Sequence, residues 1–237
     1  MVHLAEKAKS FVNQEKKQRK RTEMIRNVIF DVGYVLIGYS WKEQFLRFGF
    51  SQEEVARLSG AMFGEGVPDG SRPLWEKYDC GEVTDEEIRA ECLARYPEYR
   101  KALEWFFDNP SDWAEVLPDM ADLIPLLKEK GYRVYLLSNY PDRLWACHVA
   151  GQPFYRWTDG ETVSYAERCQ KPEERFFRIL LDRYHLRPEE CLFLDDRAGN
   201  TRQAEALGIR TITLDSPAAR LEAAKKLREM EPVSAGS

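Results

Sequence analysis

The chain has 237 residues and a formal net charge of −5, with 43% hydrophobic and 12% aromatic residues. This length fits one large domain or a domain with an insert, and the composition is ordinary for a globular protein. No apolar run approaches the roughly 18 residues of a membrane helix, and the N-terminus lacks the apolar core of a signal peptide. The acidic balance gives no support for nucleic-acid binding by the body of the protein. We therefore expect neither a membrane nor a nucleic acid as partner.

The cysteines are odd in number, are scattered along the chain and include no C-x-x-C pair. Such a pattern is typical of reduced thiols and argues against a structural zinc site. We therefore expect a cytoplasmic protein.

The N-terminal residues form a polar, basic segment. Apolar residues at helical spacing predict a helix over residues 3–20, and residues 15–21, "EKKQRKR", are strongly basic. Two interpretations remain: a patch for nucleic acid or an anionic surface, and a solvated helix that precedes the domain. We favour the second and treat residues 1–23 as a basic helical extension. At the other end, we expect residues 231–237 to be a disordered tail.

The first strand and the segment after it differ in character. "IRNVIFD", residues 25–31, reads as a buried strand that ends on Asp31. Residues 41–116 contain no clear strand. Capping-box spacings at Ser51/Glu54 and Thr84/Glu87, together with aromatic residues at helical spacing, predict a helical insert there. We expect a cap at 41–116 and an α/β core made of residues 24–40 and 117–230.

From residue 118 onward, helices and strands alternate. The expected elements are a helix over 119–130 closed by Gly131, a strand over 132–139, a helix over 141–149, a helix over 171–184 with Pro172 in its first position, a strand over 191–196, a helix over 198–207, a strand over 209–214 and a helix over 218–230. This alternation predicts an α/β fold, with a parallel Rossmann-like sheet covered by helices on both faces.

Polar side chains stand at the expected strand ends and before one helix. In open parallel sheets, ligands bind beyond the carboxyl ends of the strands, so these groups are expected to converge. They are Asp31, Ser138, Asn139, Lys171, Asp195 and Asp196. Neighbouring carboxylates repel, and a divalent cation with oxygen ligands, such as Mg²⁺, would relieve that repulsion and bridge to a phosphate. Lysine, hydroxyl and amide groups would hold the other phosphate oxygens.

These motifs resemble those of the haloacid dehalogenase-like hydrolases, which are mostly Mg²⁺-dependent phosphatases. The resemblance covers about residues 25 to 215 and rests on "VIFDVGYVL", "YLLSN", "QKPEERFF" and "FLDDRAGNTRQAEALGIRTI". The helical insert stands where this family has its cap. The cap stretch "LWEKYDCGEVTDEEI" is most similar to sugar-phosphate phosphatases such as bacterial α-glucose-1-phosphate phosphatase, and to the phosphatase domain of soluble epoxide hydrolases.

The resemblance implies a role for each site residue. Asp31 would be the nucleophile that forms an aspartyl-phosphate, and Lys171 would assist it. Ser138, Asn139 and Lys171 would bind the phosphoryl group. Asp31, Asp196 and the carbonyl of Gly33 would hold Mg²⁺, with Asp195 beside them and Asn200 outside the direct ligands. The implied substrate is a small phosphate monoester, for example glucose 1-phosphate.

Gly33 departs from the family pattern, in which most phosphatases have a second aspartate that protonates the leaving oxygen. That help is typically worth about 10²–10⁴-fold. Three alternatives follow: another group or a good leaving group replaces the acid, the protein is a dehalogenase that needs no metal, or it binds phosphate ligands without turnover. We favour the phosphatase because the Asp195–Asp196 pair has no purpose in a metal-free dehalogenase.

Overall fold

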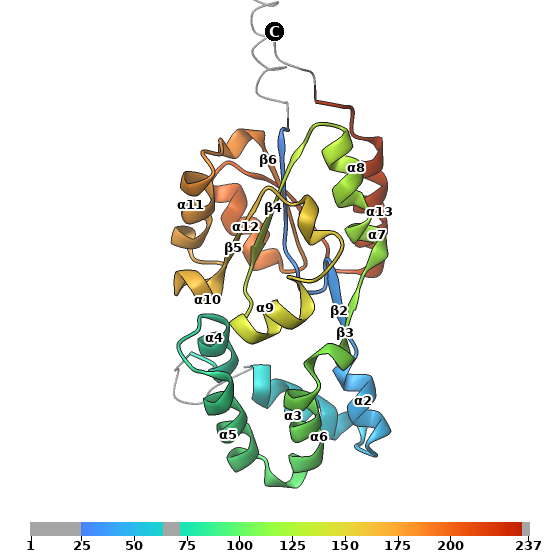
Figure 1. The fold of residues 1–237 in the computed structure, drawn as a ribbon, viewed down its shortest axis with the longest axis vertical. Helices are drawn as coiled ribbons and strands as arrows, with labels where there is room; N and C mark the ends of the chain where they lie inside the picture. The colour runs from blue at the N-terminus through green and yellow to red at the C-terminus, as the bar shows by residue number, and fades with distance from the viewer. Residues whose placement is uncertain (1–24, 64–71, 234–237) are drawn as a thin grey trace, which may run out of the picture.

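The computed structural model describes residues 25–63 and 72–233. The expected basic extension therefore lies outside the described residues, as do residues 234–237 of the expected tail. The described chain forms a core built around a sheet and a smaller all-helical part at one end of it (Figure 1). No helix among these residues is both long enough and apolar enough to cross a membrane.

A five-stranded parallel sheet, in the order β5-β4-β1-β6-β7, forms the centre of the core. Its strands are β1 (Asn27–Phe30), β4 (Arg133–Ser138), β5 (Gly160–Val163), β6 (Cys191–Asp195) and β7 (Arg210–Thr213). Four of them match the predicted strands. The edge strand β5 was not predicted, because its sequence "GETV" has one apolar residue in four.

The sheet is buried on both faces, as the alternation along β1 illustrates. Val28 and Phe30 belong to one hydrophobic cluster and Ile29 to a second, and all three are fully buried. Successive side chains of a strand point to opposite faces, so a continuous apolar run needs cover on both sides. Helices α11 and α12 lie on one side of the sheet and α7, α8 and α13 on the other (Figure 1). The predicted α/β class is confirmed.

Among the described residues, seven α-helices belong to the core. They are α7 (Pro118–Ala121), α8 (Leu123–Glu129), α9 (Asp142–His148), α10 (Ser164–Glu167), α11 (Glu174–Arg183), α12 (Ala198–Ala206) and α13 (Pro217–Glu229). The prediction of one helix over 119–130 is wrong, because the helix is interrupted at Asp122. Pro125 has no N–H to donate to the carbonyl four residues earlier, and its ring crowds that carbonyl. Gly131 follows α8 with a φ of +86°, as a C-terminal glycine should.

The start of α11 also differs from the prediction. Its first residue is Glu174, so Pro172 is not in the first helical position. The N–H of Glu173 donates to the carbonyl of Gln170 at 2.8 Å. This bond closes a turn with Lys171 and Pro172 at its centre, and the helix begins only after that turn.

The all-helical part consists of residues between β1 and β4. Its helices are α2 (Trp41–Arg47), α3 (Gln52–Phe63), α4 (Leu74–Asp79), α5 (Asp85–Arg95) and α6 (Arg100–Asp108), with the 3₁₀ turns η1 (Pro97–Tyr99) and η2 (Pro110–Trp113). Both predicted capping boxes are formed, at the starts of α3 and α5. Phe106 is buried among aromatic rings and stacks on Trp113, with centroids 4.4 Å apart.

A short ribbon joins the two parts. Strand β2 (Ile37–Tyr39) pairs antiparallel with β3 (Ala114–Val116). The expectation that residues 41–116 contain no strand is therefore wrong at its end. Three residues are too few to produce a recognisable alternation in the sequence. The ribbon supports our proposal that the cap spans residues 41–116, because all five cap helices lie between its strands.

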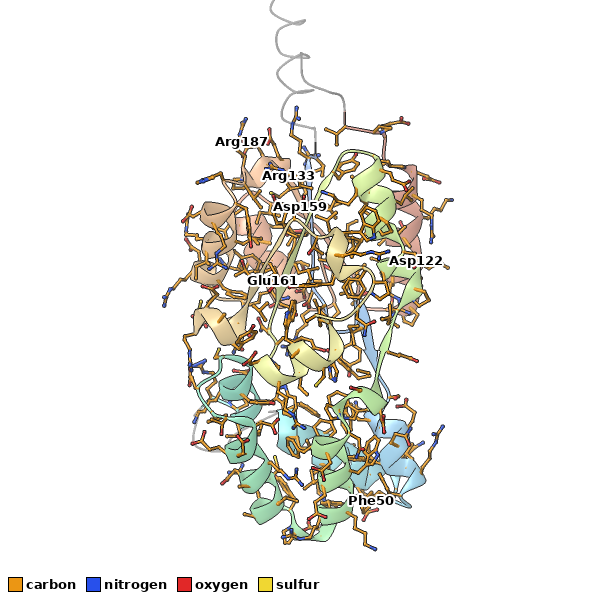
Figure 2. The ribbon with its side chains drawn as sticks, in the orientation of Figure 1. Phe50, Asp122, Arg133, Asp159, Glu161 and Arg187 are labelled. Atoms are coloured by element: carbon orange, nitrogen blue, oxygen red, sulfur yellow. The ribbon has the colours of Figure 1, made fainter. Side chains whose placement is uncertain are left out.

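The two ends of the core differ. Arg133 and Asp159 lie at the end away from the cap, and Phe50 lies at the far end of the cap (Figure 2). The end away from the cap also holds the first residues of the expected tail. The N–H of Val233 donates to the carbonyl of Lys130 at 2.8 Å, and Tyr132 Oη donates to the carbonyl of Glu231 at 2.6 Å. The prediction of a disordered tail is wrong for residues 231–233.

Phe106→Ala should destabilise the cap by about 3–5 kcal/mol, because it leaves a cavity in the aromatic core. Urea unfolding followed by tryptophan fluorescence measures this change. Phe48→Ala, at a ring that is 46% exposed, is the matched control and should cost about 1 kcal/mol or less. Equal losses for the two variants would contradict the assignment of Phe106 as the cap's central packing residue.

Candidate active site

The carboxyl ends of three neighbouring strands bring the predicted polar residues together. Asp31 follows β1, Ser138 ends β4 and Asp195 ends β6, and β1 lies between the other two strands. Phe30 of β1 pairs in register with Leu136 and Leu194, so the strands end close to one level. Ser138 Oγ donates to Asp31 Oδ1 at 2.9 Å.

Lys171 reaches these carboxylates from the turn before α11. Its Nζ lies 2.8 Å from Asp31 Oδ1 and 2.6 Å from Asp195 Oδ2, and the whole side chain is buried. Against the lowering effect of burial, Asp195 and Asp31 raise the pKa of Lys171. The charge of Lys171 is therefore balanced by two carboxylates, and α11 begins only three residues later.

The side chain of Asn139 fixes the turn that carries Lys171. Its Nδ2 donates to the carbonyl of Lys171 at 2.9 Å, and its Oδ1 accepts from the N–H of Lys171 at 2.8 Å. Both ends of the amide are thus used within the protein. Asn139 thus positions Lys171, and its second amide N–H has no partner among the described residues. The sequence pattern did not reveal this positioning role.

The two oxygens of Asp31 have different surroundings. Oδ1 lies within 3 Å of three donors, namely the Val32 N–H, Ser138 Oγ and Lys171 Nζ. The described residues give Oδ2 no donor. Burial raises the pKa of Asp31 to about 8, partly offset by Lys171 and reinforced by Asp195 and Asp196. The carboxylate is fixed through one oxygen and leaves the other for a ligand or a reaction.

The adjacent acids Asp195 and Asp196 are not equivalent. Asp195 is fully buried and accepts from the Arg197 N–H at 2.8 Å, from Asn200 Nδ2 at 2.9 and 3.0 Å, and from Lys171 at 2.6 Å. Asp196 is half-buried, and the described residues give its side chain no ion-pair partner. Burial, reinforced by Asp195, raises the pKa of Asp196 to about 6. Asn200 thus supports Asp195, and Asp196 is the acid left free.

The donor set fits a hard divalent cation. Asp31, Asp195 and Asp196 each have a carboxylate oxygen within 4.8 Å of the others. Oxygen-only ligands of this kind suit Mg²⁺. Asp195 already accepts from three donor groups, so the carboxylates that would remain to hold an ion are Asp31 and Asp196.

A cavity of about 340 Å³ opens between the core and the cap in front of Asp31. Aromatic side chains form much of its wall, including the ribbon tyrosine Tyr39, Trp41 and Trp75. Trp41 is buried and still borders the cavity, whereas Trp105 does not border it.

Two acids of α4, Glu76 and Asp79, also border the cavity, and the sequence reasoning missed them. They stand one and four residues after Trp75, and that spacing could have placed Trp75 and Asp79 on one helix face. Burial, with Glu76 nearby, raises the pKa of Asp79 well above its usual value. Burial thus favours the protonated, uncharged form of Asp79.

The space that a side chain at Gly33 would occupy is taken by Tyr39. A Cβ added to Gly33 would lie 3.1 Å from Tyr39 Oη. Tyr39 Oη donates to Tyr140 Oη at 2.8 Å, and Tyr140 Oη lies 2.9 Å from His148 Nδ1. Tyr140 also borders the cavity.

A family model for haloacid dehalogenase-like hydrolases matches residues 25–208. The chain belongs to this family. The match includes all of the predicted site residues, from Asp31 to Asn200, and it agrees with the resemblance found in the motifs.

Two curated relatives match most of the chain. The D-ribitol-5-phosphate phosphatase of Bacteroides thetaiotaomicron is 27% identical over 202 residues, which are 79% of this chain and 91% of that protein. Acyl-CoA dehydrogenase family member 10 of Mus musculus is 28% identical over 208 residues, which are 81% of this chain. The matched part makes up only 18% of the mouse protein, so this chain corresponds to one region of a much longer sequence.

Solved structures share the fold. A HAD family enzyme from Bacteroides thetaiotaomicron is 25% identical to this chain with a TM-score of 0.62, and the match covers 80% of this chain and 93% of that one. This chain thus has a phosphatase among its relatives and a cluster of three aspartates in its own structure.

Mg²⁺ should stabilise the protein more strongly at pH 8 than at pH 6, because Asp31 and Asp196 must lose protons to hold it. Without the ion, the raised folded-state pKa of Asp31 contributes stability that is present below about pH 4 and lost as the pH rises to about 8. Thermal unfolding with EDTA or with Mg²⁺ at both pH values measures the shift in Tm.

Asp196→Asn should remove most of that Mg²⁺-dependent shift in Tm. The control is Asp122→Asn, at an exposed acid beside the junction of α7 and α8 (Figure 2). The control variant should keep the full shift. An undiminished Mg²⁺ effect in Asp196→Asn would contradict the proposed metal ligands.

Proposed function

We propose that this protein is a Mg²⁺-dependent phosphatase that hydrolyses a small phosphate monoester through an aspartyl-phosphate on Asp31. The observation that carries the proposal is the state of Asp31. One oxygen is fixed by three donors, and the described residues give the other oxygen none. Asp31 borders the cavity together with Asp196, and a carboxylate oxygen of each lies within 4.8 Å of the other. A buried carboxylate held in this way is suited to attack phosphorus.

Each remaining residue has a task in this proposal. Lys171, held by Asn139, supplies positive charge beside the nucleophile, where negative charge collects on the phosphoryl oxygens. Ser138 orients Asp31 and can donate to a phosphoryl oxygen. Asp31, Asp196 and the Gly33 carbonyl would hold Mg²⁺, which when bound neutralises phosphoryl charge and screens the carboxylates from each other. Asp195 and Asn200 keep Lys171 and the β6 end in position.

The substrate is a small ester in this proposal. A cavity of about 340 Å³ holds a phosphoryl group and an alcohol of modest size. The similarity to a D-ribitol-5-phosphate phosphatase supports a sugar or polyol phosphate, and glucose 1-phosphate is a natural first candidate. The aromatic walls of the cavity suit the apolar faces of such an alcohol, and the two acids of α4 suit the hydroxyl groups of the alcohol.

The alternatives fit the site less well. A metal-free dehalogenase would leave Asp196 as an unpaired, half-buried acid near Asp31 with no ligand. A binding protein without turnover would not need a nucleophile oxygen kept free of donors. No observation in the described residues favours either of them over the phosphatase.

Asp31→Asn should lower kcat for every phosphate ester by more than about 10³-fold, because the amide cannot form the phosphoryl intermediate. Phosphate release from a panel of esters, with Mg²⁺ and with EDTA, measures this. The control is Asp182→Asn, an exposed acid on α11 that should leave the rates unchanged. Full activity of Asp31→Asn, or equal rates in EDTA, would contradict the proposal.

A further inference from the structure

We propose that the Tyr39 hydroxyl donates the proton that the leaving alcohol needs. This inference rests on the proposed phosphatase function and adds the residue that completes its chemistry. When the P–O bond of an alkyl phosphate breaks, the electron pair moves to an oxygen that is a strongly basic alkoxide. A proton donor at that oxygen is therefore required for fast cleavage.

Three residues close to the nucleophile are unsuited as this donor. Gly33, two residues after Asp31, has no side chain. Lys171 is shared between two carboxylates, and the amide of Asn139 is bonded at both ends to the Lys171 backbone. The donor must come from elsewhere in the cavity wall.

Tyr39 Oη lies in the cavity wall beside Gly33. The hydroxyl lies 3.1 Å from the point where a Cβ on Gly33 would be, so it fills the space of a side chain two residues after the nucleophile. Both Gly33 and Tyr39 border the cavity that holds Asp31. The tyrosine comes from the ribbon β2–β3, which fixes its backbone next to the site.

Tyr39 belongs to a chain of hydrogen bonds that continues through Tyr140 to His148. His148 Nε2 lies 2.9 Å from the carbonyl of Pro110, which can only accept, so Nε2 carries the proton and Nδ1 is an acceptor. Burial lowers the pKa of His148 to about 4, so the ring stays neutral. Tyr140 Oη therefore donates to Nδ1, and Tyr39 Oη donates to Tyr140.

Both hydroxyls can rotate about their C–O bonds when a substrate arrives. Tyr39 then turns its proton to the leaving oxygen, and Tyr140 turns its own proton to Tyr39. Burial raises the pKa of Tyr39 well above its usual value, so the hydroxyl keeps its proton at neutral pH.

The proposed reaction has two steps, phosphoryl transfer to Asp31 and hydrolysis of the aspartyl-phosphate. An oxygen of Asp31 forms a bond to phosphorus, the bond from phosphorus to the leaving oxygen breaks, and its electron pair takes the Tyr39 proton. The phenolate, stabilised by the Tyr140 hydroxyl, then takes a proton from water as the water oxygen attacks phosphorus. The bond between phosphorus and Asp31 breaks, the carboxylate is restored, and alcohol and inorganic phosphate leave.

Asp79 is a competing donor, because its side chain borders the same cavity and burial raises its pKa well above the usual value. It comes from the cap helix α4, whereas Tyr39 adjoins the nucleophile loop itself. The geometry beside Gly33 therefore favours Tyr39, and the experiment includes both residues.

The test compares esters with good and poor leaving groups in the presence of Mg²⁺. For Tyr39→Phe, kcat/KM on an alkyl phosphate should fall by about 10²-fold or more, and on p-nitrophenyl phosphate it should change little, since nitrophenolate leaves without a proton. Tyr132→Phe is the control. It removes a hydroxyl at the opposite end of the sheet and should leave both rates unchanged.

A rescue makes the test specific to the position. In Gly33→Asp alone, the new Cβ would lie 3.1 Å from Tyr39 Oη. In the double variant with Tyr39→Phe that oxygen is absent, and the ring carbons nearest to the new Cβ lie at 3.5 and 3.8 Å. The double variant should recover alkyl phosphate hydrolysis relative to Tyr39→Phe. This recovery would not follow if Tyr39 were only a wall residue.

Several outcomes would overturn the proposal. Equal losses on both esters would make Tyr39 a structural residue. A leaving-group-dependent loss in Asp79→Asn, with none in Tyr39→Phe, would assign the role to Asp79. Turnover of p-nitrophenyl phosphate by the wild type and Tyr39→Phe would leave the phosphatase function standing in either case. No turnover of any ester by the wild type would overturn both proposals.

Discussion

The Nζ of Lys171 lies between Asp31 Oδ1 and Asp195 Oδ2, at 2.8 and 2.6 Å, and all three side chains are buried. Two carboxylates at the ends of adjacent strands would repel each other in a poorly solvated place. The ammonium group is attracted to both carboxylates and offsets part of this repulsion. Loss of one partner from such a buried set typically costs about 3–5 kcal/mol. The rest of the site is arranged around this contact. Asn139 fixes the Lys171 backbone, and Asn200 and the Arg197 N–H donate hydrogen bonds to Asp195. The described residues leave one oxygen of Asp31 without a donor.

The topology explains why these groups meet. The central strand β1 has β4 and β6 as neighbours, so residues more than a hundred positions apart end at one edge of the sheet. The ribbon β2–β3 then leads away from that edge to the cap helices (Figure 1). Because the ribbon begins six residues after Asp31, the link to the cap also supplies a cavity residue, Tyr39. One hydrophobic cluster continues from the sheet through this ribbon into the cap, so cap and nucleophile are held by shared packing.

The sequence predicted the parallel core and the convergence of Asp31, Ser138, Lys171 and Asp195, because long apolar runs with polar ends are a strong pattern. It did not reveal β3 or β5, which are short and have too few apolar residues to show a period. It predicted a phosphoryl-binding role for Asn139 but did not reveal that the amide also holds the Lys171 backbone, since the partners of an amide depend on tertiary structure. Tyr39 was also missed, because its importance comes from its distance to Gly33, which no spacing along the chain encodes.

The central claim is that the free oxygen of Asp31 attacks phosphorus. The direct measurement is mass spectrometry of the peptide that contains Asp31, after an ester is mixed with the enzyme and Mg²⁺ and the reaction is quenched in acid during turnover. We predict a phosphoryl group on Asp31, absent without substrate. A phosphoryl group on another side chain, or steady turnover with Asp31 unmodified at every quench time, would contradict the account.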